Sequence, residues 1–152
     1  MSEPTRPAFS PAVVYRDPRA ALAWLEKAFG FETSLVVEGE NGNIVHSEMR
    51  FGDGLLMVAG PYDERHASPA DFSGRNTQSI HVQLSKDIDA HLERAKAQGA
   101  RIVRDIADQP YGDRVYAALD PEGHVWSFGQ MISAMSLDEQ AKATGSSIRE
   151  SL

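Results

Sequence analysis

A pattern that occurs twice decides the fold, first as AVVYRDPRAALAWLEKAFGFETSLVV at residues 12–37 and again as SIHVQLSKDIDAHLERAKAQGARIV at residues 79–103. Each copy begins with a short β-branched and apolar run, continues through an Asp into an amphipathic stretch, and ends in a Gly before a second apolar run. Alternating β-branched runs favour strands, and apolar residues spaced by three and four favour a helix with one buried face. Both copies therefore predict strand, helix, strand.

The ends of the two predicted helices carry residues that start and stop helices. Asp17 can cap the first helix, and Pro18 suits its first position, where no N–H donor is needed. Asp87 takes the same place in the second copy. Gly30 and Gly99, which are 69 positions apart, end the two helices because glycine tolerates a left-handed backbone.

Two further strands follow each copy, so that each half has the order strand, helix and three strands. The predicted strands are 13–15, 33–37, 44–51 and 55–59, then 79–84, 101–105, 114–119 and 125–128. Gly54 and Gly123 lie in the last turn of each half and are also 69 positions apart. We expect a positive φ at both of these glycines.

The chain divides into five parts. They are a loose arm at 1–9, a first module at 10–59, a crossover loop at 60–78, a second module at 79–130 and a tail at 131–152. In the tail, Ser136 and Glu139 have the spacing of a capping box, and Gly145 marks the stop of a short helix.

Composition limits the partners and the compartment. The net charge of −7 argues against nucleic acid or an anionic membrane as the main partner. Neither an apolar run of membrane-spanning length nor a signal peptide is evident, and there is no cysteine, which suits a cytoplasmic protein.

The tandem strand–helix–three-strand repeat resembles the vicinal oxygen chelate superfamily, which includes glyoxalases, bleomycin-resistance proteins and extradiol dioxygenases. The motifs are Arg16-Asp17-Pro18, Tyr111-Gly112-Asp113-Arg114 and the run 120–128, DPEGHVWSF. The resemblance is strongest to the glyoxalase-like subgroup. It implies an α+β fold of two βαβββ modules that form paired incomplete barrels around a shared cavity.

Metal-dependent members of that superfamily carry His or Gln on the first strand of a module and Glu on its last strand. The matching positions are Ser10 and Ser79 on the first strands, and Val58 and Ser127 on the last. Hydroxyl and apolar side chains do not make a divalent metal site, so we expect no metal ligands and no cofactor. The alternative is an atypical divalent metal site in which His81 meets His46 or Glu48.

The candidate ligand-binding residues follow from strand alternation. His81 and Gln83 share one face of their strand with Ser79, and Ser127 is the polar member of the last strand. Arg114 could reach an anionic group, with Tyr116 packing on a ligand; the competing interpretation pairs Arg114 with Asp113 or another acid across the loop.

His81 and Glu48 are the best acid–base candidates, although the sequence assigns no reaction. For Glu48 and His46 the sequence favours a solvated strand face, because Arg50 continues the polar alternation.

Several other residues are expected to have structural places. Trp126 and Phe128 are predicted in the core, whereas His66 and His91 are predicted at the surface. The apolar walls of the cavity are assigned to Val14, Leu56, Val58 and Val125.

The resulting hypothesis is a protein that binds a small organic molecule by enclosure, without the usual metal. A metal-dependent lyase, isomerase or dioxygenase is the alternative, and a structural dimer module with a filled cavity is a third interpretation. The open sheet edges and the resemblance predict a homodimer, whose modules pair either within one chain or by exchange between two chains. The identity of the ligand is left open.

Overall fold

The order strand, helix and three strands occurs twice along the chain, as the sequence predicts. The computed structural model describes residues 6–152, so the first five residues of the expected arm lie outside the described part. The first module contains β1 (Ala12–Val14), α1 (Pro18–Phe29), β2 (Glu32–Glu38), β3 (Ile44–Phe51) and β4 (Gly54–Ala59). The second contains β5 (Ser79–Leu84), α2 (Ile88–Ala97), β6 (Arg101–Asp108), β7 (Asp113–Leu119) and β8 (Val125–Met131).

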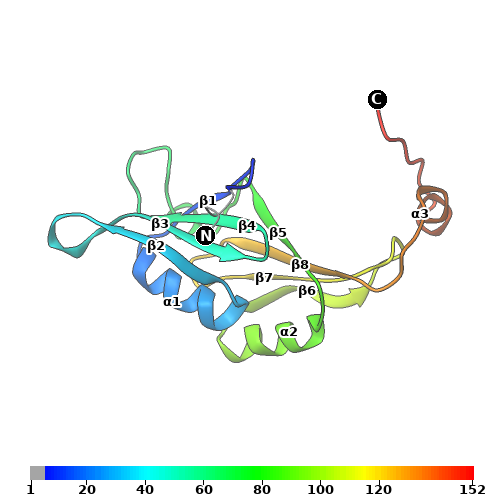
Figure 1. The fold of residues 1–152 in the computed structure, drawn as a ribbon, viewed down its shortest axis with the longest axis horizontal. Coiled ribbons are helices and arrows are strands. Elements are labelled where there is room, and N and C mark those ends of the chain that lie inside the picture. Colours follow the sequence, from blue (N-terminus) through cyan, green and yellow to red (C-terminus); the bar gives the residue numbers. More distant parts are fainter. Residues whose placement is uncertain (1–5) are drawn as a thin grey trace, which may run out of the picture.

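Each module has one four-stranded mixed sheet. The strand orders are β1-β4-β3-β2 and β5-β8-β7-β6, with the first strand parallel to the last and the remaining pairs antiparallel. Both sheets are open, and the predicted α+β class with two βαβββ modules is confirmed. Figure 1 shows the two sheets along the length of the molecule with α1 and α2 on the same side.

The helix ends agree with the sequence in the first module and differ in the second. The Asp17 carboxylate accepts from the backbone N–H of Ala20 at 3.0 Å, and Gly30 ends α1 with φ 80°. Asp87 stands before α2 with φ 58°, and its side chain makes no cap bond. Instead, the Gln130 side chain accepts from the N–H of Ile88 at 2.9 Å. The predicted Asp87 cap is therefore wrong, because a side chain distant in sequence replaces it.

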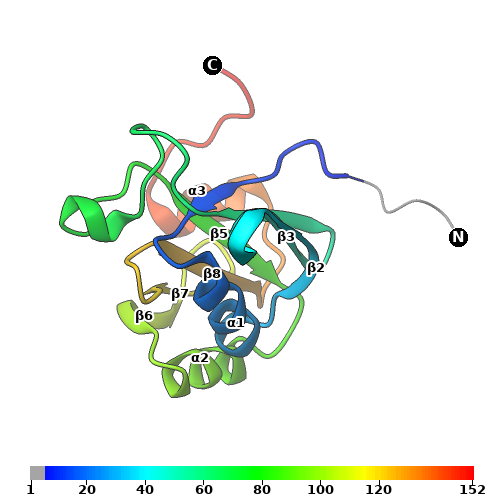
Figure 2. The same cartoon turned by 90° about the vertical axis from the view of Figure 1, so that its left-hand side faces the viewer.

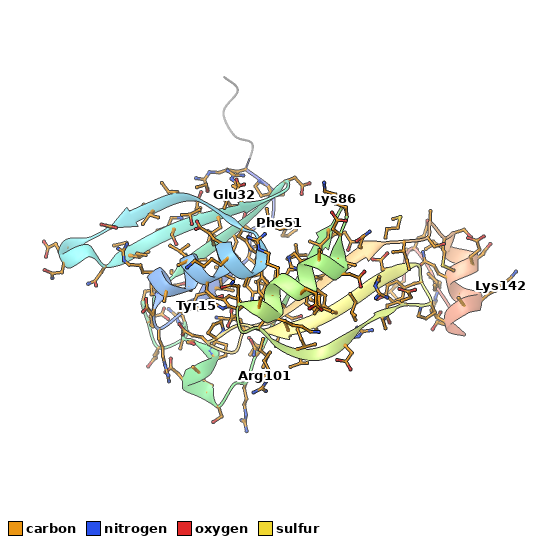
Figure 3. All side chains as sticks on the ribbon, turned by 90° about the horizontal axis from the view of Figure 1, so that it is seen from below. Tyr15, Glu32, Phe51, Lys86, Arg101 and Lys142 are labelled. Atoms are coloured by element: carbon orange, nitrogen blue, oxygen red, sulfur yellow. The ribbon has the colours of Figure 1, made fainter. Side chains whose placement is uncertain are left out.

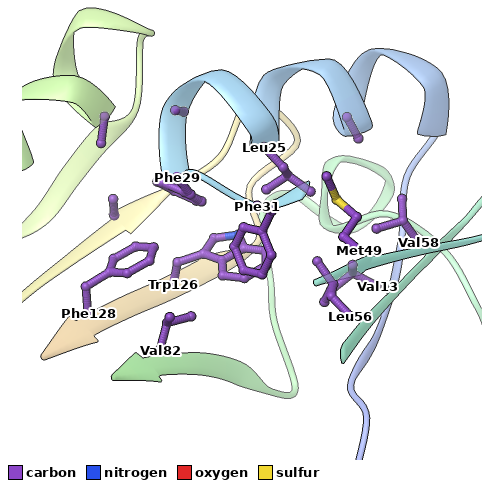
Figure 4. Close-up of a cluster of buried hydrophobic side chains, with 14 of the residues drawn as sticks. Val13, Leu25, Phe29, Phe31, Met49, Leu56, Val58, Val82, Trp126 and Phe128 are labelled. Carbon is purple, nitrogen blue, oxygen red and sulfur yellow. The ribbon is translucent and has the colours of Figure 1, made fainter. Parts of the chain in front are cut away.

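The two modules are joined through their helix-covered sides. Phe29 at the end of α1 reaches into the second module, where its ring centroid lies 5.4 Å from Trp126 and 4.7 Å from Phe128 (Figure 4). All three side chains are fully buried, which confirms the core assignment of the two β8 aromatics. Aromatic pairs at this spacing add to the stabilisation from burial. Seen from the helix side, α1 and α2 lie next to each other (Figure 3).

Polar contacts hold the same junction. Arg94 of α2 donates to the carbonyls of Lys27 and Glu26 at the end of α1, at 2.6 and 2.7 Å. The Trp24 indole N–H of α1 donates to the carbonyl of Gln98 at 2.7 Å. The Lys27 carbonyl is one that a helix end leaves without an intrahelical partner, whereas the Glu26 carbonyl also accepts from the N–H of Gly30 at 3.2 Å.

Asp120 links the turn before β8 to the first module. Its Oδ2 accepts from the Tyr15 hydroxyl at 2.6 Å and from the Trp126 indole at 3.0 Å. Its Oδ1 accepts from the backbone N–H groups of Glu122 and His124, both at 3.0 Å. Burial, together with the charge of Asp120, holds the pKa of Tyr15 well above its ordinary value, so the phenol stays a donor.

The two turns that the sequence pairs have different geometry. Gly123 has φ 93°, as expected, but Gly54 begins β4 and is not among the positive-φ residues, a place that Gly52 takes with φ 55°. The expectation for Gly54 is wrong because the turns differ in length. Phe51 pairs with Gly54 across two residues, whereas Leu119 pairs with Val125 across five.

The tail carries the predicted helix, α3 (Leu137–Thr144). Ser136 and Glu139 form both bonds of the capping box, and Gly145 follows with φ 68°. In Figure 1 the helix stands away from the sheets. None of the helices within residues 6–152 has the length and apolar character needed to cross a lipid bilayer.

His91 is half-buried at the junction, which corrects the surface position predicted for it. Its Nε2 lies 2.9 Å from the carbonyl of Phe29, and its Nδ1 lies 2.6 Å from the Tyr116 hydroxyl. Because a carbonyl only accepts, Nε2 carries the proton and Nδ1 accepts from the phenol. Burial lowers the pKa of His91 from its ordinary value of 6.5, so the imidazole is neutral at pH 7.

We expect the Asp120→Ala substitution to lower the free energy of unfolding by roughly 3 kcal/mol or more, because it leaves buried phenol and indole donors without an acceptor. Tyr15→Phe removes one bond and leaves no buried donor behind, and should cost only about 1 kcal/mol. Urea denaturation of both variants measures the difference. Equal midpoints for the two variants would show that Asp120 does not have this central role.

His91 should make stability depend on pH. The unfolded chain binds a proton near pH 6.5, whereas the folded chain resists protonation until a lower pH. The stabilisation is thus complete above pH 6.5 and declines as the pH falls from there toward the lowered pKa. Between pH 5 and 8, the free energy of unfolding should fall more steeply with decreasing pH for the native chain than for His91→Gln. Denaturation at a series of pH values measures it. Parallel profiles would contradict the burial argument.

Candidate functional site

Four polar side chains form a hydrogen-bonded row on the second sheet, on the face that α2 does not cover. His81 Nδ1 lies 2.7 Å from the Ser127 hydroxyl oxygen, and His81 Nε2 lies 2.9 Å from Gln83 Oε1. The Gln83 amide donates to Asp113 Oδ2 at 3.1 Å. We call Ser127, His81, Gln83 and Asp113 the polar row, and the uncovered face of each sheet its open face.

Strand register explains why the row forms. His81 is the direct partner of Ser127 in the parallel pairing of β5 with β8, and Gln83 is the partner of Gly129. On β5 the alternate residues Val82 and Leu84 are buried toward the helices, so the polar residues face outward. A strand pairing thus brings together three residues that the sequence assigned to one site.

Gly129 leaves the space that the row occupies. A Cβ at this position would lie 3.0 Å from Gln83 Oε1 and 3.0 Å from His81 Cε1, closer than most such contacts. No positive φ is involved at Gly129. The glycine therefore serves side-chain packing on the open face, not a special backbone conformation.

Sequence reasoning missed Asp113 and Gly129 as parts of this arrangement. Asp113 begins β7, and only the antiparallel pairing of β7 with β8 brings it to Gln83. Ser79, also predicted for the site, is exposed at the start of β5 and pairs with Val125, two positions before His81. It shares the open face but is not hydrogen-bonded to the row.

The structure places Arg114 and Tyr116 on the opposite face of β7, toward α2. Arg114 donates to Asp89 at 2.9 Å and to Asp108 at 2.8 Å, so it pairs with acids as the competing interpretation expects, although Asp113 is not one of them and bonds Gln83 instead. These bonds raise the pKa of Arg114, and the same contact lowers the pKa of Asp89. Tyr116 is fully buried and stacked on Phe128, and its burial raises the pKa of the phenol.

Glu48 and His46 form a second polar group, on the open face of the first sheet. His46 Nε2 lies 3.1 Å from Glu48 Oε1, and Arg6 donates to the same oxygen at 3.1 Å. Glu48 is only 5% exposed, which corrects the solvated position favoured by the sequence. The bonds from His46 and Arg6 hold the pKa of Glu48 below its ordinary value against the effect of burial, so the carboxylate is ionised.

Two cavities lie where the modules meet. The smaller, of about 220 Å³, has apolar walls from both modules and His81 and Gln83 at its edge. The larger, of about 560 Å³, lies beneath the crossover loop. Of the predicted wall residues, Leu56 lines the smaller cavity, and Val14 and Val125 line the larger. Val58 is fully buried in the helix-side core, so its predicted place in the wall is wrong.

The positions that the resemblance assigns to metal ligands carry unsuitable donors in this chain. Ser127 offers a hydroxyl that is bonded to His81, and Val58 lies in the core. Within the described residues, 6–152, no cluster of three His, Cys, Asp or Glu side chains is arranged to hold a metal ion. The side chains at these positions thus do not provide the donor set that a divalent cation needs. What the polar row offers is an exposed imidazole between a hydroxyl and an amide, a set suited to hydrogen bonding.

Comparison with curated proteins finds relatives of nearly full length. An uncharacterized protein of Mycobacterium bovis is 31% identical over 144 residues, which is 92% of this chain and 93% of the relative. An uncharacterized protein of Mycobacterium tuberculosis strain H37Rv is also 31% identical over 144 residues, covering 92% of this chain and 84% of the relative.

Solved structures show the same architecture. TioX from Micromonospora sp. ML1 is 34% identical, with a TM-score of 0.65 over 80% of this chain and 96% of that protein. TnmS3, an antibiotic-binding protein from Streptomyces sp. CB03234, is 18% identical, with a TM-score of 0.62 over 80% of this chain and 93% of that one.

A family model also matches residues 9–128, a range that includes the first module, the polar row and all of the second module except the end of β8. The matched range, the relatives and the repeated module agree. The chain belongs to the Glyoxalase/Bleomycin resistance protein/Dioxygenase superfamily.

Proposed function

We propose that this protein binds a small organic molecule on the open face of its second module, without a divalent metal. The polar row carries the proposal, because its imidazole, amide and hydroxyl lie together on an exposed face beside an apolar pocket. Ligand sites commonly combine apolar walls with a few placed polar groups. His81, Gln83 and Ser127 would bond the ligand, with Ser79 at the margin.

A second copy of the chain would complete the enclosure. The pocket beside the row holds about 220 Å³, whereas sites for drug-sized ligands hold about 300–1,000 Å³. Within one chain the modules meet through their helix-covered sides, so their open faces do not close on each other. The open face of the first module also exposes Leu35 and Val37, at 39% and 41%. We therefore favour a homodimer in which the first module of one copy covers the polar row of the other.

The comparisons are consistent with such a role. TnmS3, which shares the fold, is described as an antibiotic-binding protein. At 18% identity the likeness to TnmS3 is a likeness of fold.

A metal-dependent lyase, isomerase or dioxygenase is the second candidate, and one observation favours it. Glu48 and His46 place an ionised carboxylate beside an imidazole on the open face of the first module. In the proposed dimer this pair would face His81 of the second copy, which would bring three donors together. The metal content of the dimer therefore distinguishes the metal-dependent enzyme from a protein that binds its ligand without a metal.

We expect the native protein to bind bleomycin or an aromatic antibiotic from a titration panel. The His81→Ala substitution should weaken the same complex about tenfold, because it removes a central hydrogen bond. Gly129→Ala should weaken it too, because the added methyl group displaces His81 and Gln83. Glu93→Gln, on the exposed side of α2, should bind as the native chain does. Isothermal titration gives the affinities, and equal affinity for all four proteins would exclude the row as the site.

The same preparations distinguish the two candidates. After exhaustive dialysis we expect no stoichiometric nickel, zinc, iron or manganese by elemental analysis. About one equivalent per chain, lost in His46→Ala and His81→Ala, would favour the metal-dependent enzyme instead.

Light scattering at micromolar concentration should give about twice the chain mass of 16.6 kDa. Val37→Asp introduces a charge on the open face and should give monomers. Val36→Asp is the matched control, because Val36 is 40% exposed on the other face of the same strand and should leave the dimer intact. A native monomer whose mass is unchanged on tenfold concentration would contradict the dimer.

A further inference from the structure

We infer that the larger cavity is a second binding site, separate from the polar row, and that it takes an anionic organic molecule with an apolar body. The cavity lies between the crossover loop, the start of β1 and the start of β5. Figure 2 shows this loop, in green, standing away from the sheets. Its volume of about 560 Å³ is within the usual range for small-molecule sites.

The walls of the cavity suit an apolar body. Val14 and Val125 come from the two sheets, Ile80 comes from β5, and Phe72 belongs to the loop, where its side chain is 55% exposed. An exposed Phe at the mouth of a cavity offers surface that a ligand would remove from water.

The ionisable side chains that line the cavity are all bases. They are Arg65, His66, Arg75 and His124, and among residues 6–152 no Asp or Glu belongs to the lining. The chain as a whole carries a net charge of −7, so this concentration of bases is a local feature. A cleft lined by one sign of charge attracts ligands of the opposite sign.

Pairing within the loop leaves Arg75 as the available cation. Asp63, just outside the lining, bonds both Arg65 and His66, at 2.9 and 2.6 Å, and so offsets the charge of Arg65. His124 Nε2 bonds the carbonyl of Val14 at 2.7 Å. Across residues 6–152, by contrast, the Arg75 guanidinium has no hydrogen bond or ion pair. A carboxylate, sulfonate or phosphate group would supply the acceptors that it lacks.

Hydrogen bonds hold the loop in its place over the cavity. Arg16 of the first module bonds Asp71 at 2.6 Å, and Asn76 donates to the carbonyl of Gly123 at 2.8 Å. Ser68 is fully buried and caps the short 3-10 helix Pro69–Phe72. A loop fixed at both modules loses little further freedom when a ligand binds, which favours affinity.

This site does not depend on the proposed function. The cavity has no residue of the polar row in its lining. Only Pro11 and Ile80, both apolar, line the two cavities in common. Substitutions of Arg75 and of His81 therefore report on the two sites separately.

The test uses the fluorescent probe 8-anilinonaphthalene-1-sulfonate, which joins an anionic group to an apolar body, and its uncharged analogue N-phenyl-1-naphthylamine. The sulfonate probe should bind the native chain, and Arg75→Gln should weaken binding roughly three- to tenfold, the loss of one partly exposed charge-assisted contact. Arg101→Gln, which removes an exposed arginine that is not part of the cavity lining, and His81→Ala should bind as the native chain does. The uncharged analogue should not distinguish Arg75→Gln from native protein.

Backbone amide NMR locates the probe independently of these affinities. Addition of the sulfonate probe should shift the amides of Arg75, Asn76 and Thr77 and leave those of His81 and Ser127 in place. Unfolding midpoints equal to native show that each variant is folded. Shifts confined to the polar row, or equal weakening by Arg75→Gln and Arg101→Gln, would overturn the second site.

Discussion

The packing of Phe29 against Trp126 and Phe128 determines how the rest of the molecule is arranged. This contact crosses from the first module to the second and buries the helix-covered sides of both sheets in one core. Once the helix-covered sides are joined, the open faces of the two sheets cannot also meet within the chain. The polar row and the Glu48–His46 pair are consequently left on faces that a ligand or a second copy can reach. Asp120 fixes the same junction from its other end by joining Tyr15 to Trp126.

Local signals in the sequence predict the elements well. The Asp17 cap, the stop at Gly30 and the Ser136 capping box depend on residues within a few positions of one another, and all three are confirmed. The failures have a common cause. Gln130 replaces Asp87 as the cap of α2 because a strand end happens to lie beside the helix, and a shorter hairpin moves the positive φ from Gly54 to Gly52. Tertiary proximity and turn length are not visible in a local pattern.

The candidate site shows the same division between local and distant information. Alternation along β5 predicts that His81 and Gln83 share a face, and the parallel pairing of β5 with β8 adds Ser127. To predict the places of Asp113 and Gly129, the register between separate strands must be known. Alternation within one strand does not specify that register. The polar alternation along its own strand predicts a solvated position for Glu48. Contacts from Arg6 and His46 nevertheless leave Glu48 only 5% exposed. The sequence predicts on which face of the sheet a side chain lies, whereas its burial depends on which other residues lie over that face.

The two cavities share a wall, and this has a thermodynamic consequence. Pro11 and Ile80 line both, so a ligand that shifts either residue in one cavity changes the shape of the other. Any such coupling must be reciprocal, because the free energy of binding both ligands does not depend on their order. A rigid wall would give two independent sites, and a wall that adjusts would make them cooperative or competitive. Ile80 belongs to β5, an edge strand that is paired along its length with β8, so a rotation of the Ile80 side chain is the adjustment that keeps this pairing intact. Coupling between the sites is accordingly a question of how Ile80 packs.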